Sequence, residues 1–217
     1  MKREFWREKW KAQQIGFHRA EVNEALLSYA GRVFKPNSRI LVPLCGMTLD
    51  MDWLLEQGYS IVGVEFVPEA VEGLKQRWGT PDESREEGAF RIYRWGERCT
   101  IVQGDFFQLS AAGVGLVDGV WDRASIVALN PSTRVEYQNV LSASLSSQGV
   151  VLMRTFAYDQ SKMDGPPFSV EHATLKELFP VSEWTLEVLE QRRTTPEEKM
   201  KSRGLEWQSV DTYVIRR

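Results

Sequence analysis

Two buried strand-like runs, each leading into a residue with a special role, constrain the fold of this chain most. The first, Arg39-Ile-Leu-Val-Pro-Leu-Cys-Gly46, is nearly continuous in apolar residues and breaks at a glycine, and the second leads from Ser60 into Glu65. Such runs are typical of parallel sheets covered on both faces, which bind ligands beyond the carboxyl ends of their strands. A glycine there lets the backbone approach a ligand closely, and a carboxylate there can accept hydrogen bonds from ribose hydroxyls. The pair therefore predicts an enzyme that binds a nucleoside cofactor.

Predicted helices and strands alternate along most of the chain, which indicates βαβ units, right-handed crossovers and a mostly parallel sheet. Apolar residues at helical spacing predict helices over residues 2–14, 21–29, 49–57, 69–77, 134–145 and 173–179. Short apolar runs predict strands over residues 40–42, 60–64, 99–102, 119–121 and 149–156. Residues 184–191 and 209–215 are predicted to form a closing antiparallel pair. Residues 79–98 are the least regular stretch, and the polar run from Pro81 to Gly88 within it predicts a mobile loop or insertion. No linker divides the sequence, so we expect one domain over residues 1–217.

The composition excludes several classes of protein. A formal net charge of -3 argues against a nucleic-acid-binding protein, which is normally basic. The two cysteines and two histidines are not spaced as metal ligands, so we expect no metal site, and Cys45 and Cys99 lie in apolar runs typical of buried free thiols. The charged N-terminus has no signal-peptide pattern and no run is long enough to span a bilayer. We therefore expect a cytoplasmic protein that acts on a small molecule, and nothing in the sequence requires more than a monomer.

Further motifs follow in a fixed order along nearly the whole chain. They are Trp6-x3-Trp10, Gly16-Phe17-His18, Val42-Pro-Leu-Cys-Gly46, Gly63-Val-Glu65, Gly104-Asp105-Phe106, Trp121-Asp-Arg123, Ala128-Leu-Asn-Pro131 and Gly165-Pro-Pro-Phe168. Together they resemble the thiopurine S-methyltransferase family. Its members are class I methyltransferases, with a Rossmann-like α/β sandwich, and they use S-adenosylmethionine. The resemblance implies an S-methyltransferase that acts on thiopurines or other aromatic or heterocyclic thiols by in-line methyl transfer.

The resemblance also implies roles for residues at the strand ends. Leu44 and Gly46 would contact the methionine end of the cofactor, and Glu65 the ribose. Asp105 would accept a hydrogen bond from the adenine amine and Phe106 would form an apolar wall beside the ring. Each has a structural alternative, such as a tight turn for Gly46 and a helix cap for Asp105.

A second group of implied roles concerns the N-terminal cover, the end of a later strand and the C-terminal region. Residues 1–30 would form a helical cover over the cofactor site, with Trp10 in contact with the cofactor and Phe17 near the substrate. Arg123 would be the catalytic residue and would also reach the cofactor; its structural alternative is an ion pair with Asp122. The loop from Gly165 to Phe168 could form a wall of the substrate pocket. His18 and His172 have no acidic partner in the sequence and are interpreted as structural.

Two positions depart from the family pattern. Met47 stands where the family often has Lys, and Lys199 stands at the position of an Arg implicated in substrate contact. Lysine keeps the charge but loses the planar guanidinium fork. Lys199 is therefore predicted to bind the substrate, with weaker recognition of thiopurines than an arginine would give.

Other functions remain open at this point. A nicotinamide-dependent oxidoreductase is disfavoured, because residues 44–49 contain one glycine rather than a Gly-x-Gly-x-x-Gly loop. A methyltransferase of another soft nucleophile, such as a metalloid anion or a small aliphatic thiol, fits the same residues. So does a non-catalytic module that binds the cofactor.

Overall fold

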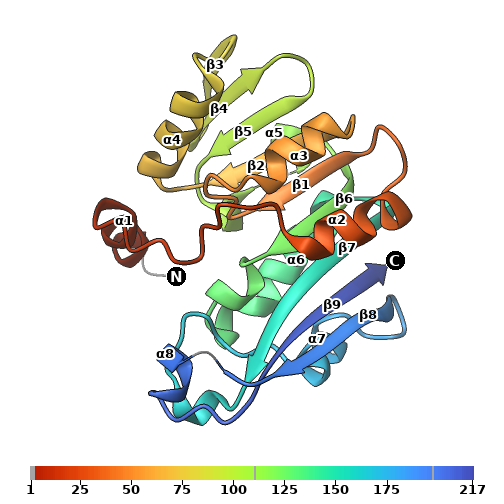
Figure 1. Ribbon diagram of the computed structural model, residues 1–217. Coiled ribbons are helices and arrows are strands. Elements are labelled where there is room, and N and C mark those ends of the chain that lie inside the picture. The colour runs from red at the N-terminus through yellow and green to blue at the C-terminus, as the bar shows by residue number, and fades with distance from the viewer. Residues whose placement is uncertain (1–2, 110, 197) are drawn as a thin grey trace.

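A nine-stranded mixed sheet runs through the whole molecule (Figure 1). The computed structural model describes residues 3–109, 111–196 and 198–217, except for the side chains of residues 3, 111, 112 and 199. The strand order is β3-β4-β5-β2-β1-β6-β7-β9-β8. The strands are β1 (Arg39–Pro43), β2 (Ser60–Glu65), β3 (Glu83–Glu87), β4 (Phe90–Trp95), β5 (Cys99–Gln103), β6 (Val117–Arg123), β7 (Leu145–Tyr158), β8 (Thr185–Thr194) and β9 (Gln208–Arg216).

The five central strands, from β5 to β7, are all parallel. An antiparallel hairpin, β8 and β9, follows β7 at one edge of the sheet. These findings confirm the predicted sheet, which is mostly parallel and closed by a C-terminal antiparallel pair. Because the central strands are parallel, their carboxyl ends meet at one edge of the sheet, which we call the carboxyl edge.

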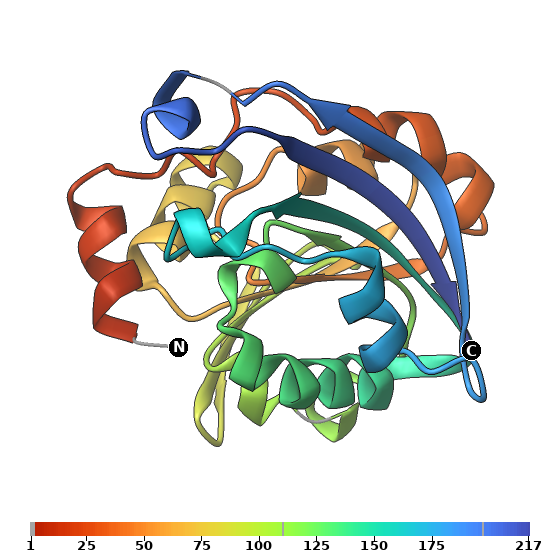
Figure 2. The ribbon, with the colours of Figure 1, turned by 90° about the horizontal axis from the view of Figure 1, so that it is seen from below.

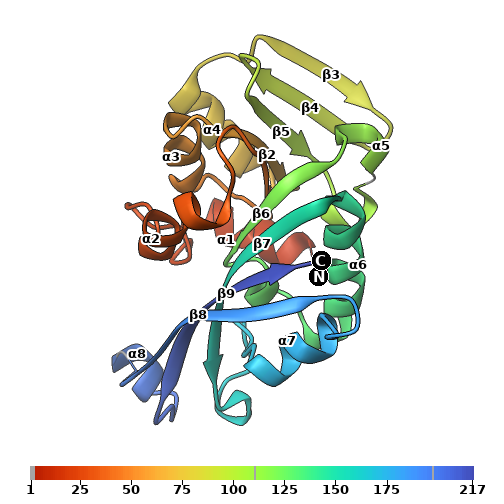
Figure 3. The same cartoon turned by 90° about the vertical axis from the view of Figure 1, so that its right-hand side faces the viewer.

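Helices cover both faces of the sheet (Figure 3). On one face lie α2 to α4 and on the other α6 and α7, while α1 stands at one end of the molecule (Figure 2). The helices are α1 (Arg3–Lys11), α2 (Glu24–Val33), α3 (Asp50–Glu56), α4 (Pro68–Trp78), α5 (Ala111–Val114), α6 (Arg134–Ser144), α7 (His172–Leu178) and α8 (Glu198–Lys201). None of the helices in the described ranges is long and apolar enough to cross a membrane.

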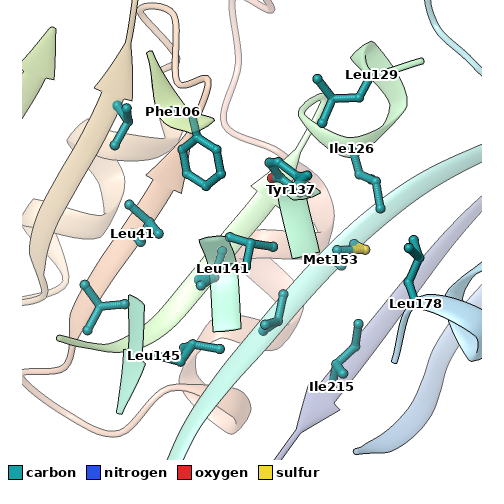
Figure 4. Close-up of a cluster of buried hydrophobic side chains, with 14 of the residues drawn as sticks. Leu41, Phe106, Ile126, Leu129, Tyr137, Leu141, Leu145, Met153, Leu178 and Ile215 are labelled. Carbon is teal, nitrogen blue, oxygen red and sulfur yellow. The ribbon is translucent and has the colours of Figure 1, made fainter. Parts of the chain in front are cut away.

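Alternation along the central strands divides the core into two clusters. Ile40 and Val42 pack into the cluster under α2 and α3, whereas Leu41 between them packs into the cluster under α6. Figure 4 shows the second cluster, with Tyr137 and Leu141 of α6 among its side chains. The near-continuous apolar runs in the sequence follow directly, because both faces of each central strand are buried.

Two predicted boundaries were wrong. The run from Pro81 to Gly88 was predicted to be a mobile loop or insertion, but it contains β3, which pairs with β4 in a hairpin that extends the sheet beyond β5. The charged β3 is an exposed edge strand, and Arg85 in its middle forms ion pairs with Glu83 and Glu87. The helix predicted from residue 21 starts at Glu24, because the side chain of Asn23 caps it.

Candidate active site

The turn after β1 has an unusual backbone. Leu44 and Gly46 both have positive φ angles, of 46° and 53°. Glycine adopts this conformation freely, whereas leucine rarely does. The turn is held against β2 by a hydrogen bond from the Cys45 N–H to the Val64 carbonyl, at 3.0 Å. The sequence prediction of a tight glycine turn at the carboxyl edge is therefore confirmed.

Glu65 lies beside this turn and is almost fully buried, with 4% of its surface exposed. One carboxylate oxygen accepts the Gly46 N–H at 2.8 Å and the other accepts the Val67 N–H at 2.7 Å. Burial nevertheless raises the pKa of Glu65 to about 7, and these backbone hydrogen bonds only partly offset it. The Phe66 N–H also interacts with the carboxylate, and the lone pairs that remain can accept further hydrogen bonds.

Arg77 of α4 holds the turn from the other side. Its guanidinium donates to the carbonyls of Met47 at 2.7 Å and Thr48 at 3.2 Å, and it pairs with Asp52 at 2.8 Å. The Met47 side chain packs against Gly73 of the same helix, where a Cβ atom would lie 2.6 Å from the Met47 sulfur. No sequence pattern distinguishes Arg77 from any other charged residue of a surface helix.

The segment after β5 contains Asp105 and Phe106, which were predicted to contact the adenine. The Asp105 carboxylate accepts the Phe107 N–H at 3.1 Å and so caps a short 3-10 helix, Phe106–Gln108. Phe106 was predicted to form a wall beside the adenine, but its ring is 1% exposed and packs on Tyr137, with 5.0 Å between ring centroids. Its side chain belongs to the core and is not available to a ligand.

A surface cavity of about 420 Å³ lies beside the ends of β2 and β5. Phe66 and Gly104 line it, together with Phe90 of the β3–β4 hairpin. Gly104 is required here, because a Cβ atom at this position would overlap the Phe90 ring. The missed hairpin thus contributes one wall of a cavity at the carboxyl edge.

Arg123 ends β6, and its guanidinium forms no hydrogen bond or ion pair with the described part of the chain. Burial lowers its pKa, as do Arg19 and Arg154, while the negative charge of Asp50 opposes this shift. The predicted alternative, an ion pair with Asp122, is absent among these residues. Asp122 points to the opposite face, where it accepts hydrogen bonds from the Tyr137 hydroxyl at 2.8 Å and a backbone N–H.

The N-terminal segment passes the carboxyl ends of β1 and β2 on its way from α1 to α2 (Figure 1). Trp10 is 4% exposed, and a Cβ atom at Gly46 would lie 3.1 Å from its ring. Phe17 packs edge-on against Trp6 and Trp10, with centroids 5.4 and 5.7 Å apart. Trp10 therefore covers the turn after β1, while Phe17 lies at the margin of this aromatic group.

The remaining predicted residues lie further along the chain. The loop from Gly165 to Phe168 is tied down by the Phe168 N–H, which donates to the Val127 carbonyl at 2.6 Å, and by the Tyr158 hydroxyl, which donates to Pro167 at 2.6 Å. Lys199 belongs to α8, but its side chain lies outside the described part of the structure.

Comparison with known proteins settles the family. A family model for thiopurine S-methyltransferase (TPMT) matches residues 1–217. The thiopurine S-methyltransferase of Pseudomonas putida (strain GB-1) is 42% identical over 187 residues, which cover 86% of this chain and 85% of that protein. That of Pseudomonas aeruginosa (strain UCBPP-PA14) is 36% identical over 219 residues and covers 100% of both chains.

The chain belongs to the thiopurine S-methyltransferase family. It is therefore an enzyme that uses S-adenosylmethionine as its methyl donor. Solved structures agree on the class I methyltransferase fold. A Burkholderia thailandensis 1,6-didemethyltoxoflavin-N1-methyltransferase with bound S-adenosylhomocysteine has a TM-score of 0.64 at 20% identity and covers 99% of this chain and 87% of its own. TehB from Haemophilus influenzae has a TM-score of 0.60 at 15% identity, and the match covers 97% of this chain and 67% of the TehB chain.

The residues at the carboxyl edge are compatible with the cofactor of this family. Gly46 lies in a buried turn against the Trp10 ring, and its N–H and that of Val67 hold the Glu65 carboxylate at this edge, where it would accept the ribose hydroxyls. The unpaired guanidinium of Arg123 can take a carboxylate or another anion. The roles of Trp10, Leu44, Asp105, Phe17 and Lys199 toward cofactor and substrate stay predictions.

Proposed function

We propose that this enzyme methylates the sulfur of aromatic or heterocyclic thiols, thiopurines included, by in-line displacement. The observation that carries the proposal is the half-buried and unpaired guanidinium of Arg123, at the same edge as the turn of Gly46 and the buried Glu65. A desolvated cation without a partner is stabilised by a bound anion. An aromatic thiol is readily ionised, and its thiolate is such an anion. The relatives named thiopurine S-methyltransferase support this class of acceptor.

In the proposed reaction, S-adenosylmethionine supplies the methyl group on a positively charged sulfonium. Glu65 and the backbone of the turn after β1 would hold the cofactor, with Asp105 near the adenine and Leu44 near the methionine end. Arg123 would orient the acceptor and stabilise its negative charge. Alignment of the acceptor sulfur with the methyl carbon can lower the barrier by up to roughly 7–11 kcal/mol in favourable cases.

Residues 1–30 would act as a cover during this step. The transfer neutralises a thiolate and a sulfonium, so the exclusion of water strengthens the attraction between them. Trp10 already lies on the turn of Gly46, and Phe17 packs against it. An aromatic face is also a favourable neighbour for a sulfonium, through cation–π attraction.

The test is product formation from purified protein, S-adenosylmethionine and 6-mercaptopurine, measured by mass spectrometry. We expect S-methylated product at catalytic turnover, and calorimetry on the same sample should show cofactor binding. Binding without product would exclude the thiopurine acceptor and favour another soft nucleophile. An Arg123→Lys variant serves as a matched control, because it keeps the charge and removes the guanidinium fork.

A further inference from the structure

His18 lies in the segment between α1 and α2. This segment is anchored at both ends. Before it, Trp10 packs on the turn of Gly46; after it, the Asn23 N–H donates to Asp50 at 2.8 Å. Asp50 also accepts the indole N–H of Trp121 at 2.8 Å. Because Trp121 is on β6, the segment is held between the ends of β1 and β6, and this places His18 near the carboxyl edge.

The imidazole of His18 is half-buried and forms no hydrogen bond with the described part of the chain. The charged groups that act on it electrostatically are Arg77 of α4 and Arg123 of β6, and Arg19 follows it on its own segment. Burial, and after it these two facing arginines, lower the pKa of His18. The lowered pKa disfavours the imidazolium, and the neutral ring has an acceptor nitrogen that no described residue engages.

Other buried acids at this edge are already engaged. Glu65 accepts two backbone N–H groups, Asp122 accepts the Tyr137 hydroxyl on the opposite face, and Asp50 accepts from Asn23 and Trp121. Cys45 is buried, and burial raises the pKa of its thiol. His172, the other histidine, stacks on Tyr213 with centroids 5.7 Å apart. Nδ1 of His172 also has no hydrogen-bond partner among the described residues, but it is buried beside Tyr213, whereas His18 is half-buried and within the electrostatic influence of Arg123.

We propose that His18 is the general base for acceptor thiols that are not ionised at neutral pH, so that alkyl thiols as well as aryl thiols are substrates. This rests on the proposed S-methyltransferase function. The S–H proton moves to the imidazole nitrogen and leaves its electron pair on the acceptor sulfur. That sulfur forms a bond to the methyl carbon, and the old bond from carbon to the donor sulfur breaks with its electron pair remaining on the donor. The products are a thioether, S-adenosylhomocysteine and an imidazolium that releases its proton to solvent.

The experiment compares two acceptors that differ in ionisation. One is 2-mercaptoethanol, mostly protonated at neutral pH, and the other is 5-thio-2-nitrobenzoate, a thiolate at the same pH. Formation of S-adenosylhomocysteine gives kcat/KM for wild type, His18→Gln, His18→Asn and the matched control His172→Gln. General bases contribute about 100-fold or more. We expect both His18 variants to lose about 100-fold with 2-mercaptoethanol and no more than about threefold with the thiolate, and His172→Gln to lose neither activity.

Two further readouts separate a base from a structural residue. Calorimetric affinity for S-adenosylhomocysteine should be equal in wild type and His18→Gln. The imidazole signals can be titrated by nuclear magnetic resonance with S-adenosylhomocysteine bound. The titration midpoint should lie below the usual histidine value, and it should match the midpoint of the acidic limb in the pH profile of kcat/KM for 2-mercaptoethanol.

Each contrary result has a distinct meaning. Equal losses of kcat/KM with both acceptors in the His18 variants would overturn the assignment of His18. So would a wild-type enzyme that methylates 5-thio-2-nitrobenzoate but not 2-mercaptoethanol. Wild-type protein that binds S-adenosylhomocysteine but methylates neither acceptor, nor 6-mercaptopurine, would instead overturn the proposed thiol class.

Discussion

Cofactor affinity should rise with pH, because the carboxylate that we expect to accept the ribose hydroxyls has a pKa of about 7. Ribose hydroxyls donate to the ionised form of Glu65, so the protonated form must lose its proton before the cofactor binds. The apparent dissociation constant then increases by a factor of one plus the ratio of protonated to ionised Glu65. At about pH 6 that factor is about eleven and at about pH 8 it is close to one. The affinity for S-adenosylhomocysteine should therefore improve about tenfold over this range, or about 1.4 kcal/mol.

The assay is calorimetric titration with S-adenosylhomocysteine at several pH values, on wild type and Glu65→Gln. The variant cannot titrate at this position, and its amide nitrogen would face one of the two N–H groups of Gly46 and Val67. We expect it to bind about 1–3 kcal/mol more weakly. Titration of the ligand's own amino group affects both proteins equally, so the difference between their pH profiles isolates Glu65. Identical pH profiles in the two proteins would refute the assignment.

The same pKa shift has a consequence for stability without cofactor. The folded-state value of about 7 lies above the ordinary 4.5, so the folded protein binds more protons than the unfolded chain between these values. Glu65 therefore favours folding fully below about pH 4.5, and this contribution is lost as pH rises through about 7. A shift of this size corresponds to about 3 kcal/mol. Urea unfolding should show a loss of stability with pH in wild type that is smaller in Glu65→Gln.

Three other substitutions test the remaining parts of the site. Arg123→Ala should lower kcat/KM for 6-mercaptopurine by about tenfold or more, the size of one lost charged hydrogen bond, and an unchanged value would remove this residue from the site. Gly46→Ala should lower the free energy of unfolding in urea by roughly 1–2 kcal/mol, because Gly46 has a positive φ. The control Gly31→Ala, in α2 with open space around it, should not destabilise the protein. Equal losses of stability in the two variants would contradict the backbone argument. Trp121→Phe should cost about 1–3 kcal/mol, because it leaves one oxygen of the buried Asp50 unpaired; wild-type stability would show that this hydrogen bond contributes nothing.

The central sheet could be predicted because burial on both faces leaves a continuous apolar signal, as in Ile40 to Val42. The β3–β4 hairpin could not, because the edge strand β3 has no buried face to give an apolar pattern. Its residues Glu83 to Glu87 are stabilised by pairing with β4 and by ion pairs. These interactions depend on the partner strand, which the local sequence does not specify.

The relative positions of the candidate site residues could be predicted where spacing fixes them, but the orientation of individual side chains could not. The hydrogen bond between Gly46 and Glu65, at 2.8 Å, shows that the two residues lie together as their spacing indicated. Phe106 and Phe107 are adjacent aromatic residues, and only the fold shows that Phe106 is the one in the core. Arg77 was missed because its partners are backbone carbonyls of a distant turn, which leave no mark in the sequence.

Two neighbouring arginines differ in how their charges are compensated. Arg123 and Arg154 are partners in the register of β6 and β7, and their like charges oppose each other. Arg154 is compensated, since it donates to Asn23 at 3.1 Å and pairs with Glu24 at 2.7 Å. Arg123 has no such partner in the described residues, and its positive charge is compensated only through the electrostatic effect of Asp50. Because a partly desolvated cation without a partner is costly, Arg123 favours a bound anion at the carboxyl edge, and the thiolate acceptor that we propose would be such an anion.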